Sequence, residues 1–320
     1  MRRLLLIITL LVVSVFVADA QSREVEVECE WGSLSATIDM PEGETSTAVL
    51  VVAGSGPTDR YGNSAGGLNT YSYKMLGEGL AKEGFAVMRY DKRAIGLSAY
   101  PAERIPALLL DDYIDDARHC VEFLHAEGFD RVIVAGHSEG GLIALVLASD
   151  EDTKVDGVVL LCAAGYPMDE ILNYQLSQQL VPAYMGLMMR STNIIRSLKQ
   201  GEQVPAEEIP AELMSLFHPS VQPFIINSMQ YDPVAYAKQV KCPVLIVSGG
   251  RDIQVAPSNG VRLAEAMPEA ELVVFENMTH VLKDADTSDR IEQLLGVYSN
   301  ANLTITEGLV LAIVNFINNK

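Results

Sequence analysis

The chain contains two kinds of hydrophobic pattern. Near its start, Val25-Glu26-Val27-Glu28 and Leu34-Ser35-Ala36-Thr37-Ile38 alternate apolar with polar or small residues, which predicts two half-buried antiparallel strands. The later pattern consists of short apolar runs without alternation, typical of parallel strands covered on both faces. These runs are Ala48–Ala53, Phe85–Met88, Val132–Ala135, Val158–Cys162, Val244–Val247 and Leu272–Phe275.

Amphipathic helical stretches separate the apolar runs. In Leu108–His125, for example, the apolar residues recur at helical spacing, at Leu109, Tyr113, Ala117, Val121 and Leu124. Strands that alternate with helices predict an α/β fold with a doubly wound, mostly parallel sheet.

Residues 165–235 break this alternation, because they contain no clear strand and read as helices punctuated by prolines. A connection of this length is too large for a simple crossover, so we expect a helical cap inserted over the strand ends. The segment holds six of the twelve methionines: Met168, Met185, Met188, Met189, Met214 and Met229. They fit ordinary helix packing and an adaptable wall around an acyl group equally well.

The first twenty residues have the three parts of a cleavable secretory signal: Arg2 and Arg3, an apolar stretch from Leu4 to Val17, and Ala18-Asp19-Ala20. The alternative is a membrane anchor, but a helix of this stretch spans only about 21 Å of a bilayer core of about 30 Å. We therefore expect a signal peptide at 1–20, a mature domain at 21–320, and export to the periplasm or the medium.

Charge and cysteine spacing exclude several classes of function. Removing residues 1–20 removes two of the 23 basic and one of the 42 acidic side chains, which leaves a net charge of about −20. Such acidity opposes binding to nucleic acid or to anionic lipid. The wide spacing of Cys29, Cys120, Cys162 and Cys242 excludes a zinc ribbon or a CxxC pair, and Cys120, Cys162 and Cys242 are expected to be small buried thiols.

The strongest chemical signal is Gly136-His137-Ser138-Glu139-Gly140, which lies between a predicted strand and a predicted helix. This is the G-x-S-x-G nucleophile elbow in the context that it requires. The glycines let neighbouring backbones approach closely and hold the Ser138 hydroxyl out at the helix N-terminus. We therefore expect Ser138 to be a nucleophile.

A serine hydroxyl needs a base and an orienting acid. Asp252 follows the strand at 244–247, and His280 follows the strand at 272–275 and is the only histidine C-terminal to Asp252. The order Ser138, Asp252, His280 is the one expected for this elbow. Asp232 is the weaker alternative acid. The other histidines, His119, His125, His137 and His218, are expected on helices, in the elbow or in the cap.

The negative charge of a tetrahedral intermediate needs preorganised donors. One is expected to be the backbone N–H of Glu139, directly after the nucleophile. The other is expected from the loop Gly54-Ser55-Gly56-Pro57, at Ser55. The acidic side chain of Glu139 also suits the first turn of a helix.

Several motifs together resemble the exported bacterial α/β-hydrolases, in their serine-aminopeptidase-like and acyl-thioester-hydrolase-like branches. They are Gly54–Arg60 with Gly62-Asn63-Ser64, Arg89–Arg93 with Gly96 and Ser98, and the elbow at Gly136–Gly140. The resemblance runs from about residue 24 to the last helix and implies the triad Ser138, Asp252 and His280. Ala94 departs from the glycine usual after Asp-Lys-Arg, and Asp59 with Arg60 is expected either to shape the mouth of the site or to form a structural ion pair.

The leading hypothesis is a serine hydrolase that cleaves a small carboxylic ester, such as an acylated sugar or a phenolic ester, without metal or organic cofactor. The alternative on the same triad is an aminopeptidase, with Glu170, Glu207, Glu208 or Glu212 binding the substrate amine, or an acyl-thioesterase. A catalytically silent binding module is the third. The expected partner is a small-molecule ester, and the sequence does not indicate the oligomeric state.

Overall fold

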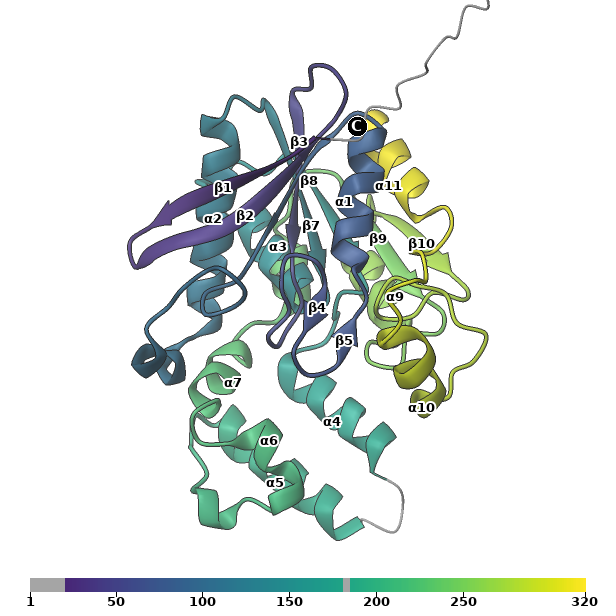
Figure 1. Cartoon of the computed structure of the whole chain (residues 1–320). Helices are drawn as coiled ribbons and strands as arrows, with labels where there is room; N and C mark the ends of the chain where they lie inside the picture. Colours follow the sequence, from purple (N-terminus) through teal and green to yellow (C-terminus); the bar gives the residue numbers. More distant parts are fainter. Residues whose placement is uncertain (1–20, 181–184) are drawn as a thin grey trace, which may run out of the picture.

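The computed structural model describes residues 21–180 and 185–320 (Figure 1). The expected signal peptide at 1–20 lies outside the described residues. The strands of the main sheet are β1 (Gln21–Cys29), β2 (Gly32–Met40), β3 (Thr47–Val52), β6 (Ala86–Tyr90), β7 (Arg131–His137), β8 (Gly157–Leu161), β9 (Val244–Gly249) and β10 (Glu271–Phe275). The longer helices are α1 (Ser72–Lys82), α2 (Leu110–Ala126), α3 (Glu139–Ser149), α4 (Met168–Gln179), α5 (Met185–Lys199), α9 (Ser258–Ala266) and α11 (Leu309–Asn318). The shorter ones are α6 (Met214–Phe217), α7 (Gln222–Ser228), α8 (Pro233–Ala237) and α10 (Arg290–Gln293).

Within the described part of the chain, eight strands form one sheet in the order β1-β2-β6-β3-β7-β8-β9-β10. The pairs β1–β2 and β2–β6 are antiparallel, and every later pair is parallel. The mostly parallel sheet predicted from the apolar runs is therefore confirmed. A separate two-stranded ladder joins β4 (Asn63–Ser64) to β5 (Leu68–Asn69).

The predicted half-burial of the second strand is wrong. All residues from Leu34 to Asp39 in β2 are buried, including those on the face that the alternation assigned to solvent. The reason is that arginine side chains cover this polar face. Arg89 donates hydrogen bonds of 2.8 and 3.0 Å to the Asp39 carboxylate, and Arg60 donates one of 3.1 Å to the Thr37 hydroxyl.

Helices cover both faces of the sheet (Figure 1). On β3, Ala48, Leu50 and Val52 belong to the apolar cluster that also contains residues of α2, α3 and α9, whereas Val49 and Val51 belong to the cluster formed with α1 and α11. Burial on both faces explains why these strands lack alternation. The last strand, β10, is an exception, because it lies at the edge of the sheet and leaves Val274 49% exposed.

A helical segment interrupts the alternation between β8 and β9. It contains α4, α5, α6, α7 and α8, and Figure 1 shows α4 to α7 grouped beyond one end of the sheet. These helices enclose an apolar cluster of their own, which includes Leu176, Ile194, Leu198 and Phe217.

All four cysteines are free thiols. Cys120 and Cys162 are buried as expected. The expected burial of Cys242 is wrong: it precedes β9 and lines a separate cavity, so that it is only partly buried, as is Cys29. No helix in residues 21–180 or 185–320 is long and apolar enough to cross a membrane.

Candidate active site

Ser138 lies in a sharp turn between β7 and α3. Its backbone is strained, with φ 54° and ψ −118°, and its N–H donates to the Leu161 carbonyl at 2.9 Å. A Cβ at Gly136 would lie 2.1 Å from the Gly140 carbonyl oxygen, and one at Gly140 would lie 2.3 Å from the Val52 carbonyl oxygen. The two glycines are therefore required by close backbone contact, as the elbow motif predicted.

Asp252 and His280 come together from the loops that follow β9 and β10. The Asp252 Oδ2 atom lies 2.7 Å from His280 Nδ1, and both side chains are buried. The other carboxylate oxygen accepts hydrogen bonds of 2.8 Å from the backbone N–H groups of Gln254 and Val255. A carboxylate held in this way fixes the imidazole with its proton on Nδ1, which leaves Nε2 free to accept a proton.

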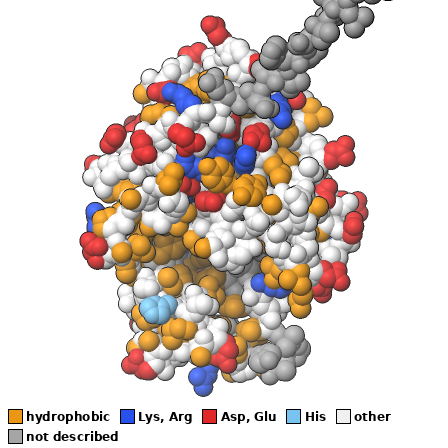
Figure 2. All heavy atoms as spheres, in the orientation of Figure 1, with side chains coloured by type: hydrophobic (Ala, Val, Ile, Leu, Met, Phe, Trp, Pro, Cys, Tyr) orange, Lys and Arg blue, Asp and Glu red, His pale blue; other side chains and the backbone are white. Residues whose placement is uncertain are grey.

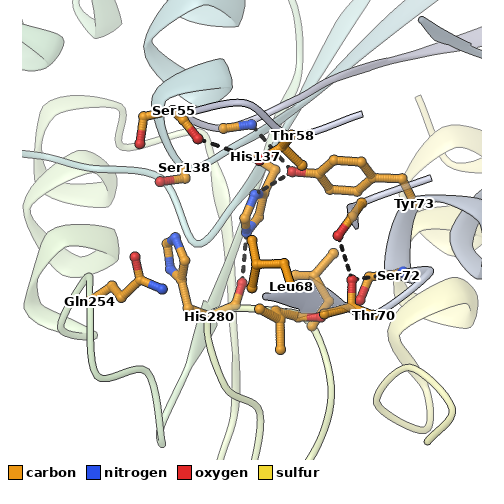
Figure 3. Close-up of a pocket in the computed structure, with 14 residues that line it drawn as sticks. Ser55, Thr58, Leu68, Thr70, Ser72, Tyr73, His137, Ser138, Gln254 and His280 are labelled. Atoms are coloured by element: carbon orange, nitrogen blue, oxygen red, sulfur yellow. Dashed lines mark hydrogen bonds between the residues drawn. The ribbon is translucent and has the colours of Figure 1, made fainter. Parts of the chain in front are cut away.

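Ser138 and His280 line the same narrow cavity of about 70 Å³ (Figure 3). The Ser138 hydroxyl forms no hydrogen bond with any described residue. Catalytic hydrogen bonds are often long without substrate and shorten when it binds, so this geometry is compatible with proton transfer from Ser138 to His280.

The loop after β3 lies directly against the nucleophile. A Cβ at Gly54 would lie 3.0 Å from the Cβ of Ser138, and Ser55 lines the cavity beside Ser138 (Figure 3). The backbone N–H groups of Ser55 and Glu139 donate to no described residue, so both are free to bind an oxyanion.

Lys92 fixes this loop through hydrogen bonds, a function that the sequence analysis missed. Its buried ammonium donates hydrogen bonds of 2.6 Å to the Gly54 carbonyl and 2.8 Å to the Gly56 carbonyl. Lys92 belongs to the motif Arg89–Arg93, which was the only signal in the sequence that pointed to it.

A second missed residue is Tyr73 on α1. The Gly54 N–H donates to its hydroxyl at 3.2 Å, and the same hydroxyl lies 2.8 Å from His137 Nδ1. The other ring nitrogen of His137 lies 2.7 Å from the His280 carbonyl oxygen (Figure 3). Because a carbonyl can only accept, Nε2 of His137 carries the proton. Burial, followed by the proximity of His280, lowers the pKa of His137 to about 3.

Other expected residues lie elsewhere or have different partners. The alternative acid Asp232 is not at the site, since its carboxylate caps α8 by accepting from the Val234 N–H at 3.0 Å. Arg60 does not pair with Asp59. Its buried guanidinium instead bonds to the Asp91 carboxylate at 2.9 and 3.1 Å.

Ala94, the residue that replaces a glycine, has φ 64°. This is the left-handed region, where glycine is relaxed and alanine is strained. The usual glycine thus has a conformational reason, and the alanine adds strain at a position that lines neither of the cavities next to Ser138.

A larger cavity of about 400 Å³ opens on the other side of Ser138, between the sheet and the helical segment. Figure 2 shows hydrophobic side chains gathered around a hollow in this region. Its lining includes Tyr166, Ile171, Leu172, Leu216, Val221, Phe224 and Ile225. Of the six methionines of this segment, for which helix packing and a cavity wall were both open, only Met168 lines this cavity. Met229 is buried in the helical cluster, and Met185 and Met189 are exposed.

Among the described residues, one group has the donor types of a metal site: Cys162, Asp252 and His280, whose ligand atoms lie within 4.8 Å of one another. Burial raises the pKa of the Cys162 thiol, which disfavours the thiolate that a metal needs. The Asp252 carboxylate and the His280 imidazole are already bonded to each other.

The doubly wound sheet, the elbow and the buried Asp–His pair define an α/β-hydrolase with a Ser-His-Asp arrangement. The family model described as "Serine aminopeptidase, S33" matches residues 65–285. The chain therefore belongs to this family.

Two individual proteins are similar to this chain at low sequence identity. Esterase EstD of Thermotoga maritima is 28% identical over 272 residues, which cover 82% of this chain but 61% of EstD. Serine hydrolase BPHL of Homo sapiens is 32% identical over 131 residues, 40% of each chain. This chain thus spans less than two thirds of these two curated relatives.

Solved structures match over nearly the whole chain and support the fold. The Pyrococcus furiosus esterase Pf2001 has a TM-score of 0.58 at 19% identity, covering 94% of this chain and 91% of that one. Est1E from Butyrivibrio proteoclasticus with bound ferulic acid has a TM-score of 0.60 at 17% identity, covering 92% and 98%.

Proposed function

We propose that the protein is a serine hydrolase that cleaves carboxylic esters through an acyl-enzyme on Ser138. The observation that carries the proposal is the 2.7 Å bond between Asp252 and His280, together with the cavity that His280 shares with the strained Ser138. Family membership and the similarity to EstD support the same reaction class.

In the proposed reaction, His280 Nε2 takes the hydroxyl proton while Ser138 Oγ attacks the carbonyl carbon. The N–H groups of Ser55 and Glu139 stabilise the oxyanion, and Asp252 stabilises the imidazolium. His280 then returns the proton to the leaving alcohol as the ester bond breaks. A water activated by His280 hydrolyses the acyl-enzyme and releases the acid.

The two cavities indicate how an ester is oriented. His280 lines the narrow cavity of about 70 Å³ and not the larger one, and it must reach the leaving oxygen to protonate it. The alcohol therefore occupies the narrow cavity, whose lining includes Thr58 and Thr70, and the acyl group occupies the apolar cavity of about 400 Å³. The narrow cavity holds a small alcohol, or only the first atoms of a larger one such as the sugar of an acylated sugar. The aromatic wall at Phe224 suits a phenolic acid as the acyl group.

The test is the release of p-nitrophenol from acetate and butyrate esters. Ser138→Ala should abolish it and should prevent labelling by a fluorophosphonate probe, whereas Ser177→Ala, at an exposed serine on α4, should do neither. Equal rates for wild type and Ser138→Ala would overturn the proposal and favour a silent binding module.

The aminopeptidase alternative has weaker support. The cap carboxylates Glu170, Glu207, Glu208 and Glu212 are exposed, and none lines the cavity next to Ser138. Turnover of aminoacyl-naphthylamides or acyl-thioesters above that of p-nitrophenyl esters would favour one of the alternatives.

We also propose that the protein is exported after cleavage behind Ala20, and that the helices at 165–235 act as a cap over the acyl cavity. The proposed export rests on the sequence of residues 1–20 alone. Fractionation of cells that express the full chain, with N-terminal sequencing of the released protein, tests it. A start at Met1 in the cytoplasmic fraction would contradict export.

A further inference from the structure

The side chain of Glu139 is a buried carboxyl with no described role in the reaction. It is 8% exposed and lines the apolar cavity together with Leu142 and Phe224. Its Oε2 atom is fully buried and has no hydrogen-bond partner among the described residues. The other carboxyl oxygen, Oε1, is not fully buried and also has no hydrogen-bond partner among the described residues. Leaving a buried carboxyl without partners costs free energy, so a ligand group of suitable chemistry that reaches Oε1 from the cavity would be bound there.

The nearest cation does not satisfy this carboxyl. The Lys92 ammonium acts on Glu139 electrostatically, but its hydrogen bonds go to the Gly54 and Gly56 carbonyls, and no ion pair joins the two side chains. Burial raises the pKa of Glu139, with Lys92 opposing the rise. In either protonation state, the carboxyl can accept a hydrogen bond from a ligand.

Charge distinguishes the kinds of donor that fit. A substrate ammonium would lose its hydration in a buried site where the Lys92 cation already offsets the charge of the Glu139 carboxylate, so little net attraction would remain to compensate that loss. A hydroxyl group donates a hydrogen bond without adding charge. Glu139 therefore suits a neutral hydroxylated ligand better than an amine.

We infer that Glu139 is a specificity-determining residue that binds a hydroxyl group on the acyl part of the substrate. The acyl group would be apolar enough for the cavity and would carry a hydroxyl within reach of the residue that follows Ser138. The inference rests on the proposed ester hydrolysis and adds the class of acyl group, namely hydroxylated aliphatic or aromatic acids.

The experiment compares matched methyl esters by acid release: hexanoate with 3-hydroxy- and 6-hydroxyhexanoate, and 3-phenylpropanoate with its para-hydroxy derivative. For wild type, kcat/KM for at least one hydroxylated ester should exceed that of its partner by about 10-fold or more, the discrimination of one good hydrogen bond. Glu139→Leu should reduce this ratio to about 1, whereas Glu139→Gln, which keeps an acceptor oxygen, should retain most of it.

The ratio of kcat/KM between the two esters of a pair separates a loss of specificity from a general loss of catalysis. A displaced Lys92 or oxyanion loop would slow both esters of a pair equally and leave this ratio unchanged. Glu212→Leu, at an exposed glutamate of the helical segment, should leave the ratio unchanged. A wild-type ratio below 2 for every pair would overturn the inference, and so would a preference that survives in Glu139→Leu. Absence of Ser138-dependent hydrolysis of any ester would instead overturn the proposed function.

Discussion

The Tyr73 hydroxyl donates a 2.8 Å hydrogen bond to Nδ1 of His137 and accepts one from the Gly54 N–H. His137 in turn donates to the carbonyl of His280. One buried chain of hydrogen bonds thus joins the oxyanion loop, the elbow and the histidine loop, three segments that must keep their relative positions for catalysis.

Tyr73→Phe removes two of these bonds while keeping the ring. We expect kcat for p-nitrophenyl butyrate to fall about 10-fold, because loosened loops stabilise the transition state less, with little change in KM. Tyr71→Phe, at the exposed tyrosine two residues earlier, should leave kcat unchanged. A higher KM with normal kcat would indicate that Tyr73 affects substrate binding instead.

Acid should destabilise the protein through His137. An unfolded histidine binds a proton below about pH 6.5, whereas burial lowers the pKa of folded His137 to about 3, so the unfolded state binds more protons between these values. The free energy of unfolding should fall by about 1.4 kcal/mol per pH unit from this residue as pH drops below about 6. Urea titrations at pH 7, 5 and 4 measure this slope.

The control for this effect is the same series on His137→Gln. The variant should be less stable at pH 7, and its stability should depend less steeply on pH than that of wild type. His119→Gln, at a partly exposed histidine, should keep the wild-type slope. Identical slopes for wild type and His137→Gln would refute the assignment.

Ala94→Gly should stabilise the fold. The φ of 64° strains alanine but not glycine, and this gain exceeds the entropy that glycine adds to the unfolded chain, for a net increase of about 0.5 kcal/mol in the free energy of unfolding. Helical Ala148→Gly should change it by about 1 kcal/mol in the opposite direction. Chemical denaturation measures both, and the kinetic constants of Ala94→Gly should match wild type.

Asp91→Asn should be among the most damaging single substitutions outside the catalytic residues. The Asp91 carboxylate accepts three hydrogen bonds from Arg60, and one from the Leu97 N–H at 2.9 Å. Loss of the Asp91 charge leaves the buried guanidinium of Arg60 with the exposed Glu24 as its remaining acidic partner among the described residues, at a cost of about 3 kcal/mol. Glu151→Gln, which breaks the exposed pair with Lys241, should leave the denaturation midpoint unchanged.

Leu172→Trp tests the acyl cavity. Leu172 lines this cavity from α4, so a larger side chain should fill space that a long acyl group needs and an acetyl group does not. The ratio of kcat/KM for hexanoate to acetate should fall about 10-fold, a change of the size that pocket contacts with a few methylenes produce. Leu187→Trp, in the same segment but away from this lining, serves as control.

The parallel strands, and the places of Ser138, Asp252 and His280 after three of them, could be predicted from the sequence because apolar runs and G-x-S-x-G are local signals. The sequence did not reveal Tyr73, which meets His137 across 64 positions of the chain, or the pairing of Arg60 with Asp91. These contacts depend on how distant segments pack. The methionines show the same limit, since composition did not indicate which side of a helix faces the cavity.

The hydrogen bonds from Lys92 to the Gly54 and Gly56 carbonyls also affect how ester hydrolysis starts after enzyme and substrate are mixed. A loop whose carbonyls are fixed by a buried cation presents the Ser55 N–H before any ligand arrives, so hydrolysis needs no slow activating step. Progress curves should be linear from the moment of mixing, without a lag, and a boronic acid inhibitor should reach its full effect as fast as it binds.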